Sequence, residues 1–361
     1  MKTKTMIAAI VLLFAGAIVV KTLPQSEAAY TSPIVDNEGN TVSGSIAALE
    51  QVRLNGIEQW ILIRGRDTSK PVLLFLHGGP GFSLMPFVSL FQTAELEANF
   101  VVVHWDQRGT GKSYSEDLSP EDMRVAKLVE DTRDLTRHLC ARFGKDRIFM
   151  LGHSWGSALG FMTISEYPEL YHAYVAAGEA ADWNKRQKMS FNWTLDQARR
   201  ENHQQAMKAL ESLQPFSSDS QPHIAIKNEW LAVFGGEYHA RAMYETYENH
   251  IGQGTEYTDD DLRKLEAGSQ WSEETLEAEA IRSGYSLFQS LPETSTPVYF
   301  FAGRHDHQTP SSLAKDYYDV LVAPTKEFIW FEESAHYTIF AESDKATREL
   351  IRIAKQTLSG N

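Results

Sequence analysis

The sequence predicts an α/β fold with a mostly parallel central sheet and an inserted helical segment. Short apolar runs with strand character alternate with helix-like segments along the chain, as in βαβ units. The pair Asn55-Gly56 separates two alternating stretches, residues 45–53 and 59–64, and predicts a hairpin at the start of the sheet. Later strands are expected at residues 72–76, 100–105, 148–151, 173–177, 297–303 and 327–331.

Residues 1–28 have the pattern of an export signal. Lys2 and Lys4 precede an uninterrupted run of small and apolar residues, 6–20, and small residues follow at Ser26-Glu27-Ala28. A helix of that length spans only ~22 Å, against ~30 Å of bilayer hydrocarbon, which favours a cleaved signal. The alternative is an N-terminal membrane anchor. In either case we expect a secreted or periplasmic protein, with a polar linker at 29–44.

A glycine-rich turn, His77-Gly78-Gly79-Pro80-Gly81, directly follows the apolar strand 72–76. Backbone N–H groups in such a turn can approach a substrate closely, so Gly79 is a candidate donor to an oxyanion. His77 is expected to be structural. After the next strand, Asp106 and Arg108 are expected either to hold this turn in place or to form a surface ion pair.

The pentapeptide Gly152-His153-Ser154-Trp155-Gly156 lies between a strand and a helix-like segment. This context predicts a nucleophile elbow, in which a strained turn exposes the Ser154 hydroxyl and the glycines avoid collisions with neighbouring elements. Ser154 is the candidate nucleophile. The backbone N–H of Trp155, at the start of the helix, is the second candidate oxyanion donor.

A serine nucleophile requires a base and an acid that orients the base. The strand 297–303 ends in a loop with Asp306, and the strand 327–331 is followed by His336. We therefore predict that His336 takes the proton from Ser154 and that Asp306 orients the imidazole. Glu179 and Asp182, just after the strand 173–177, form a rival acid site.

The predicted core is divided by a lid. Residues 45–181 and 293–361 carry the strands, whereas residues 182–292 are polar, helical and aromatic. An insertion after a strand end would cover the face that carries Ser154, exclude water and shape the pocket.

Composition excludes several function classes. The formal net charge of −14 disfavours binding to nucleic acid or anionic membranes, because both reward clustered Lys and Arg. Cys140 is the only cysteine, so no intramolecular disulfide can form. Zinc-ligand spacings are absent from the sequence, and Gly111-Lys112-Ser113 lacks the upstream glycine of a phosphate-binding loop. We predict no metal, no cofactor and no nucleotide.

Three motifs together resemble the α/β-hydrolase superfamily and its proline iminopeptidase-like group: residues 77–81, residues 106–113 and residues 152–157. The resemblance spans roughly residue 44 to the C-terminus and is strong only in the core segments. It implies an α/β-hydrolase fold and a triad of Ser154, Asp306 and His336.

The resemblance also implies a lid glutamate that binds the free α-amino group of the substrate. Tyr247-Glu248-Asn249-His250 is similar to that lid segment and assigns the role to Glu248, with Glu237 and Glu179 as weaker candidates and a solvated helix-face glutamate as the alternative. The expected function is an aminopeptidase that releases N-terminal residues, such as proline, from short peptides. An esterase or lactonase and a non-catalytic binding protein are the alternatives.

Overall fold

The computed structural model describes residues 28–239, 250 and 253–359. Its centre is an eight-stranded sheet in the order β1-β2-β4-β3-β5-β6-β7-β8. Strands β1 and β2 form the predicted hairpin, β2 pairs antiparallel with β4, and every later pairing is parallel. The prediction of a mostly parallel α/β sheet is therefore confirmed. The strands are β1 Ile46–Leu54, β2 Ile57–Gly65, β3 Val72–Leu76, β4 Val101–Asp106, β5 Ile148–His153, β6 Tyr171–Ala177, β7 Val298–Gly303 and β8 Lys326–Phe331.

Helices cover both faces of the sheet, which explains why the central strands are mostly apolar. In β3, Leu74 and its even-numbered neighbours pack into one core cluster with α3 and α4, whereas Leu73 and Phe75 pack into the other with α2 and α14. These helices are α2 Ala94–Asn99, α3 Val125–Phe143, α4 Trp155–Glu166 and α14 Ser343–Ser359.

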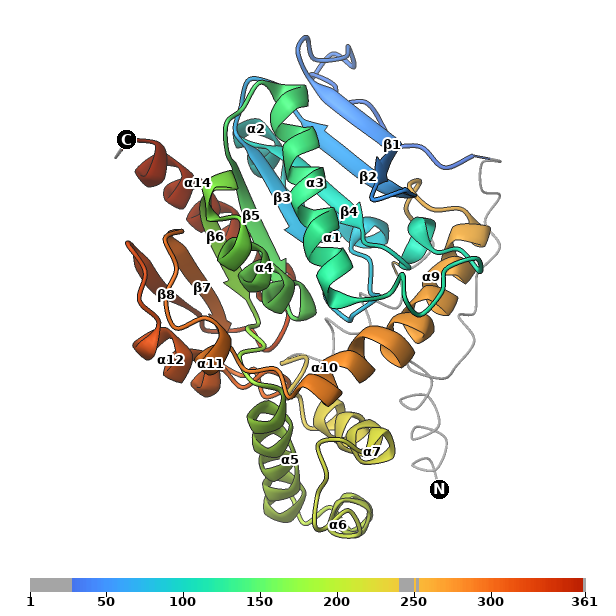
Figure 1. The fold of residues 1–361 in the computed structure, drawn as a ribbon, viewed down its shortest axis with the longest axis vertical. Helices are drawn as coiled ribbons and strands as arrows, with labels where there is room; N and C mark the ends of the chain where they lie inside the picture. The colour runs from blue at the N-terminus through green and yellow to red at the C-terminus, as the bar shows by residue number, and fades with distance from the viewer. Residues whose placement is uncertain (1–27, 240–249, 251–252, 360–361) are drawn as a thin grey trace.

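A helical insertion lies between β6 and β7, in the segment predicted as a lid. Figure 1 shows α5, α6 and α7 grouped beyond the ends of the central strands, with α9 and α10 running obliquely beside them. The short helix α11 leads back to β7. The bounds are α5 Trp183–Arg200, α6 Gln204–Glu211, α7 Gln221–Val233, α9 Asp259–Ser272, α10 Ala278–Ser283 and α11 Leu287–Ser290, with a π-helical turn, Glu273–Glu277, between α9 and α10.

Close contacts join this insertion to the core. The ammonium of Lys112 lies 2.5 Å from a carboxylate oxygen of Asp261 in α9. A Cβ atom added to Gly81 would lie 2.7 Å from the Cβ of Ser272 at the end of α9, so only glycine allows this approach. Helix α9 therefore packs directly on the turn that contains Gly79.

No helix within the described residues is both long enough and apolar enough to cross a membrane. The segment predicted to be an export signal lies outside them, apart from Ala28.

Candidate functional site

The turn between β5 and α4 holds Ser154 in a strained backbone conformation. Its φ is 55° and its ψ is −116°, a region that non-glycine residues rarely occupy. The flanking glycines are required by contact distances: a Cβ atom on Gly152 would lie 2.2 Å from the carbonyl oxygen of Gly156, and one on Gly156 would lie 2.2 Å from that of Leu76. The Ser154 backbone is fixed by its N–H, which donates to Ala177 at 2.9 Å. The local geometry is that of a nucleophile elbow.

Asp306 and His336 meet in a buried hydrogen bond. Oδ2 of Asp306 lies 2.9 Å from Nδ1 of His336. The hydroxyl of Thr309 donates to the same carboxylate oxygen at 2.8 Å, and the backbone N–H of Thr309 donates to Oδ1, also at 2.8 Å. These bonds fix the plane of the carboxylate. Thr309 was not identified from the sequence. The available signal was its position three residues after an aspartate and just before helix α12 (Ser311–Val320).

The imidazole of His336 lies beside the strand end that carries Ser154. A Cβ atom on Gly178, which directly follows β6, would be 2.9 Å from two atoms of that ring. Nε2 of His153 lies 3.1 Å from the carbonyl oxygen of His336, and the two imidazole centroids are 4.9 Å apart. The hydroxyl of Ser154 itself makes no hydrogen bond with any residue in the described part of the chain, His336 included.

Neither rival acid forms a hydrogen bond with His336 within the described residues. Asp182 is the N-cap of α5, and its carboxylate accepts from the backbone N–H of Lys185 at 2.8 Å. Glu179 is buried, and neither of its carboxylate oxygens has a well-formed hydrogen bond within the described residues. Burial raises the pKa of Glu179 to about 8, against the weaker opposing effects of Ser157 and the backbone of Ala180. Asp306 is thus the carboxylate that contacts His336.

The raised pKa of Glu179 predicts a pH-dependent stability. Its folded-state pKa of about 8 exceeds the ordinary 4.5, so the folded protein binds the proton more tightly, and stability is lost as pH rises through this range. At roughly 1.4 kcal/mol per pKa unit, the loss has a ceiling of ~5 kcal/mol. We expect Glu179→Gln to raise Tm relative to wild type at pH 9 but not at pH 5, measured by calorimetry. The exposed Glu201→Gln is the matched control; an equal Tm difference at both pH values would contradict the prediction.

The residues of the two candidate oxyanion donors, Gly79 and Trp155, line the same small pocket. Gly79 has a φ of 108°, and Trp155 is the first residue of α4. Neither N–H donates a hydrogen bond within the described ranges of the chain. A helix N-terminus and a positive-φ glycine are suited to stabilise a developing oxyanion.

His77 supports the glycine-rich turn, as expected for a structural residue. The backbone N–H of Gln107 donates to its Nε2 at 3.2 Å, and the Gln107 amide donates to its carbonyl oxygen at 3.1 Å. Burial lowers the pKa of His77 to about 4, so the ring is neutral and can accept this bond. Gln107, which the sequence did not single out, therefore holds the start of the turn.

The expectation for Asp106 and Arg108 is corrected in part. Asp106 accepts hydrogen bonds from Ser83, just beyond the turn, and from the lid residue Tyr257. Arg108 instead forms a bidentate, fully buried ion pair with Asp131 of α3, at 2.7 and 2.8 Å. The guanidinium pairs with α3 because Asp131 offers two coplanar oxygens, which suit its fork of donors. Both residues are buried, so the alternative of a surface ion pair is wrong.

The predicted lid carboxylates fall in different places. Glu248 lies outside the described residues. Glu237 accepts from the hydroxyl of Tyr337 at 3.2 Å, and its backbone carbonyl accepts from the N–H of His336 at 3.0 Å. Burial raises the pKa of Glu237. The chain after α7 therefore contacts the His336 loop directly.

A small pocket adjoins the Gly79 turn and brings in three residues that the sequence did not indicate. Gly79 and Trp155 line it from the core, and Arg186, Glu277 and Tyr285 line it from the lid. Burial raises the pKa of Glu277, whereas the nearby cations Arg186 and Lys227 lower it. Glu277 is the described lid carboxylate that shares a pocket with the candidate oxyanion donors.

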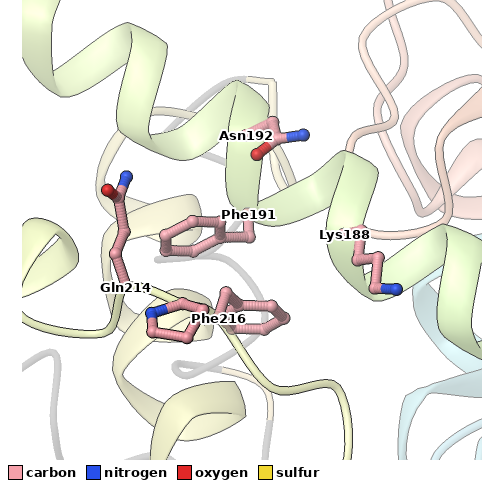
Figure 2. Close-up of a pocket in the computed structure, with 6 residues that line it drawn as sticks. Lys188, Phe191, Asn192, Gln214 and Phe216 are labelled. Atoms are coloured by element: carbon pink, nitrogen blue, oxygen red, sulfur yellow. The ribbon is translucent and has the colours of Figure 1, made fainter.

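A second, larger hollow lies on the lid, with a volume of about 310 Å³. Figure 2 shows its lining, where the rings of Phe191 and Phe216 lie face to face. Their centroids are 4.4 Å apart. This hollow shares no residue with the site described above. Among the described residues, no cluster of three or more His, Cys, Asp or Glu side chains could hold a metal ion.

Comparison with known proteins identifies relatives along most of the chain. A family model described as alpha/beta hydrolase fold matches residues 71–342. The probable aminopeptidase YbaC of Bacillus subtilis (strain 168) is 30% identical over 316 residues, covering 87% of this chain and 98% of that protein. A proline iminopeptidase of Clostridioides difficile (strain 630) is 27% identical over 324 residues, covering 85% and 96%.

Solved structures show the same fold. The proline iminopeptidase-related protein TTHA1809 from Thermus thermophilus superposes with a TM-score of 0.62 at 20% identity, covering 85% of this chain and 97% of that one. Proline iminopeptidase from Mycobacterium smegmatis gives a TM-score of 0.58 at 19% identity, covering 87% and 100%.

Proposed function

Because this chain belongs to the α/β-hydrolase fold family, in its proline iminopeptidase-like group, and is a hydrolase, we propose that it is a serine aminopeptidase acting on short peptides. The hydrogen bond between Asp306 and His336, beside the strained turn of Ser154, carries this proposal. Aminopeptidase activity is further supported by the names of the relatives. The signal-like residues 1–28 support export.

In the proposed mechanism, Asp306 accepts the Nδ1 proton of His336, which leaves Nε2 free as the base. The Ser154 hydroxyl gives its proton to Nε2 as its oxygen attacks the substrate carbonyl carbon. Catalytic hydrogen bonds are often long in unliganded enzymes and tighten with substrate, so we expect the bond from Ser154 to His336 to form in the complex.

The tetrahedral intermediate places its negative oxygen between the N–H groups of Gly79 and Trp155. His336 then protonates the leaving amine, the C–N bond breaks, and an acyl ester remains on Ser154. Water, deprotonated by His336, attacks this ester and releases the N-terminal residue. No step requires a metal or cofactor.

For the free α-amino group, the structure offers a second candidate besides Glu248. Glu277 lines the pocket of the proposed oxyanion donors, and an ammonium ion there would form a charge-assisted bond worth ~1.5–3 kcal/mol. Burial raises the pKa of Glu277. A bond to the substrate ammonium would act in the opposite direction and favour the ionised carboxylate.

The test compares aminoacyl-2-naphthylamides with p-nitrophenyl acetate, which has no amino group. We expect Glu277→Gln to lower kcat/KM for alanyl- and prolyl-naphthylamide by roughly 10- to 150-fold, the equivalent of that bond, and to change p-nitrophenyl acetate hydrolysis less than about threefold. Glu274→Gln, an exposed change in the same helical turn, is the matched control.

Equal losses on both substrate types would show that Glu277 acts on folding or on the triad instead. Ester cleavage without any cleavage of aminoacyl amides would favour the esterase alternative.

A further inference from the structure

The pocket between the Gly79 turn and the lid contains polar side-chain atoms that no described residue satisfies. Nε1 of Trp155, Nε of Arg186 and the hydroxyl of Tyr285 are buried atoms that make no hydrogen bond within the described residues. All three side chains line this one pocket. A buried polar group left without a hydrogen bond destabilises the folded protein. The indole nitrogen of Trp155 and Nε of Arg186 can act only as donors. Three such unsatisfied groups in one pocket therefore indicate that the pocket binds a hydrogen-bond acceptor.

Arg186 also lacks an ion pair with any residue that the structure describes. No carboxylate oxygen in the described ranges lies within 4.0 Å of its guanidinium, although Glu277 lines the same pocket. The guanidinium lies over the ring of Trp183, 4.4 Å from its centroid, which fixes its orientation. Burial lowers the pKa of Arg186, and the largest opposing effect comes from the charge of Glu277. The pocket thus holds a cation and an anion that do not neutralise each other by direct contact.

The backbone of the lid is irregular at this pocket. Glu277 ends the π-helical turn between α9 and α10. Such turns occur mostly as single insertions in α-helices and frequently at functional sites.

The space enclosed is small, about 30 Å³. A bound water needs roughly 10–15 Å³, so the pocket accepts a group with about two water-sized atoms. The two oxygens of a carboxylate meet this limit, accept hydrogen bonds only, and match the charge of a guanidinium.

We propose that Arg186, with Tyr285 and the indole of Trp155, binds a carboxylate group of the substrate. This inference deepens the proposed function and rests on it: Arg186 takes a carboxylate of the substrate in the enclosed space, and the ammonium of the same substrate pairs with Glu277 at the edge of that space. The carboxylate has two possible sources, an acidic side chain on the N-terminal residue or the free C-terminus of a very short peptide.

Three substrate pairs, each matched except for the charge, separate these sources. Acidic acyl groups are tested with p-nitrophenyl hemisuccinate against p-nitrophenyl butyrate, and with aspartyl- against asparaginyl-naphthylamide. The free C-terminus is tested with Ala-Ala against Ala-Ala-amide. We expect wild type to prefer the charged member by at least tenfold in kcat/KM, either in the first two pairs or in the third.

Arg186→Gln is expected to remove this preference, lowering kcat/KM for the charged member by 10- to 100-fold and for the neutral member by less than threefold. Arg186→Lys should retain part of the preference, since the charge remains without the fork of donors. Arg199→Gln, an exposed change on the same helix, should leave every ratio as in wild type.

The inference is overturned if the wild type shows no preference for the charged substrate in any pair. It is also overturned if Arg186→Gln lowers kcat/KM equally for the charged and the neutral substrate, which is the result expected if Arg186 only balanced the charge of Glu277. Failure of the proposed function gives a different result, in which esters are cleaved but aminoacyl substrates are not. In that case the ester pair, hemisuccinate against butyrate, tests whether Arg186 binds a carboxylate. Succinate gives a readout without turnover. It should raise the Tm of wild type but not of Arg186→Gln, and no shift in wild type would count against the inference.

Discussion

Replacing Ser154 with alanine is expected to lower kcat by on the order of 10⁶-fold, the loss typical of removing a serine nucleophile from an intact triad. The substitution removes the atom that we propose forms the acyl ester, so binding and the proposed oxyanion donors can supply only a residual rate above that of water. Hydrolysis of p-nitrophenyl acetate and of an aminoacyl-naphthylamide measures the loss. Covalent labelling by a fluorophosphonate probe should disappear in the same variant.

Folding should be almost unaffected by this change. The Ser154 hydroxyl makes no hydrogen bond with a described residue, so its loss breaks none. The backbone strain at φ 55° is the same for alanine as for serine. We therefore expect Tm to stay within about 2 °C of wild type. Ser290→Ala, an exposed serine in α11, is the control and should keep full activity. Folded wild-type protein that resists the probe would favour the non-catalytic binding alternative.

The core of the fold could be read from the sequence because parallel strands buried on two faces are apolar at almost every position. Strands β3 and β5 show this most clearly, since all their residues are buried. Functional residues placed just after such strands are also predictable, because the carboxyl ends of parallel strands meet at one edge of the sheet. That rule indicated Asp306 and His336, and the structure joins them at 2.9 Å although 30 residues separate them.

The lid residues missed by the sequence analysis depend on tertiary contacts. Arg186 and Glu277 lie 91 positions apart in polar helical sequence, where a charged side chain is normally solvated. Only the packing of the lid on the Gly79 turn brings them into one pocket. The pairing of Arg108 was missed for the same reason, since the charge pattern does not show that Asp131 faces the core. Glu248 and the export signal lie outside the described residues and stay predictions.

Changing Asp306 to asparagine is expected to lower kcat by about 10⁴-fold while preserving the fold. Asparagine keeps the shape of the side chain, and its amide oxygen can still accept from the backbone of Thr309. Its NH₂ group, placed at the position of Oδ2, would donate to Nδ1 of His336 and favour the tautomer with the proton on Nε2. That nitrogen could then no longer accept the proton of Ser154.

The pH profile separates this effect from simple misfolding. With Nε2 protonated in the resting variant, kcat should recover partly at alkaline pH, where hydroxide can replace the general base, whereas a damaged fold gives a uniform loss. Asp319→Asn makes the same chemical change on the exposed face of α12, where the carboxylate pairs with Lys315, and should match wild type at every pH. If Asp306→Asn kept more than about a tenth of wild-type kcat, Asp306 would not be the orienting acid. The next residue to replace would then be Glu179, whose carboxyl group is buried. Glu179 lies just after β6, next to Gly178, which contacts the His336 ring.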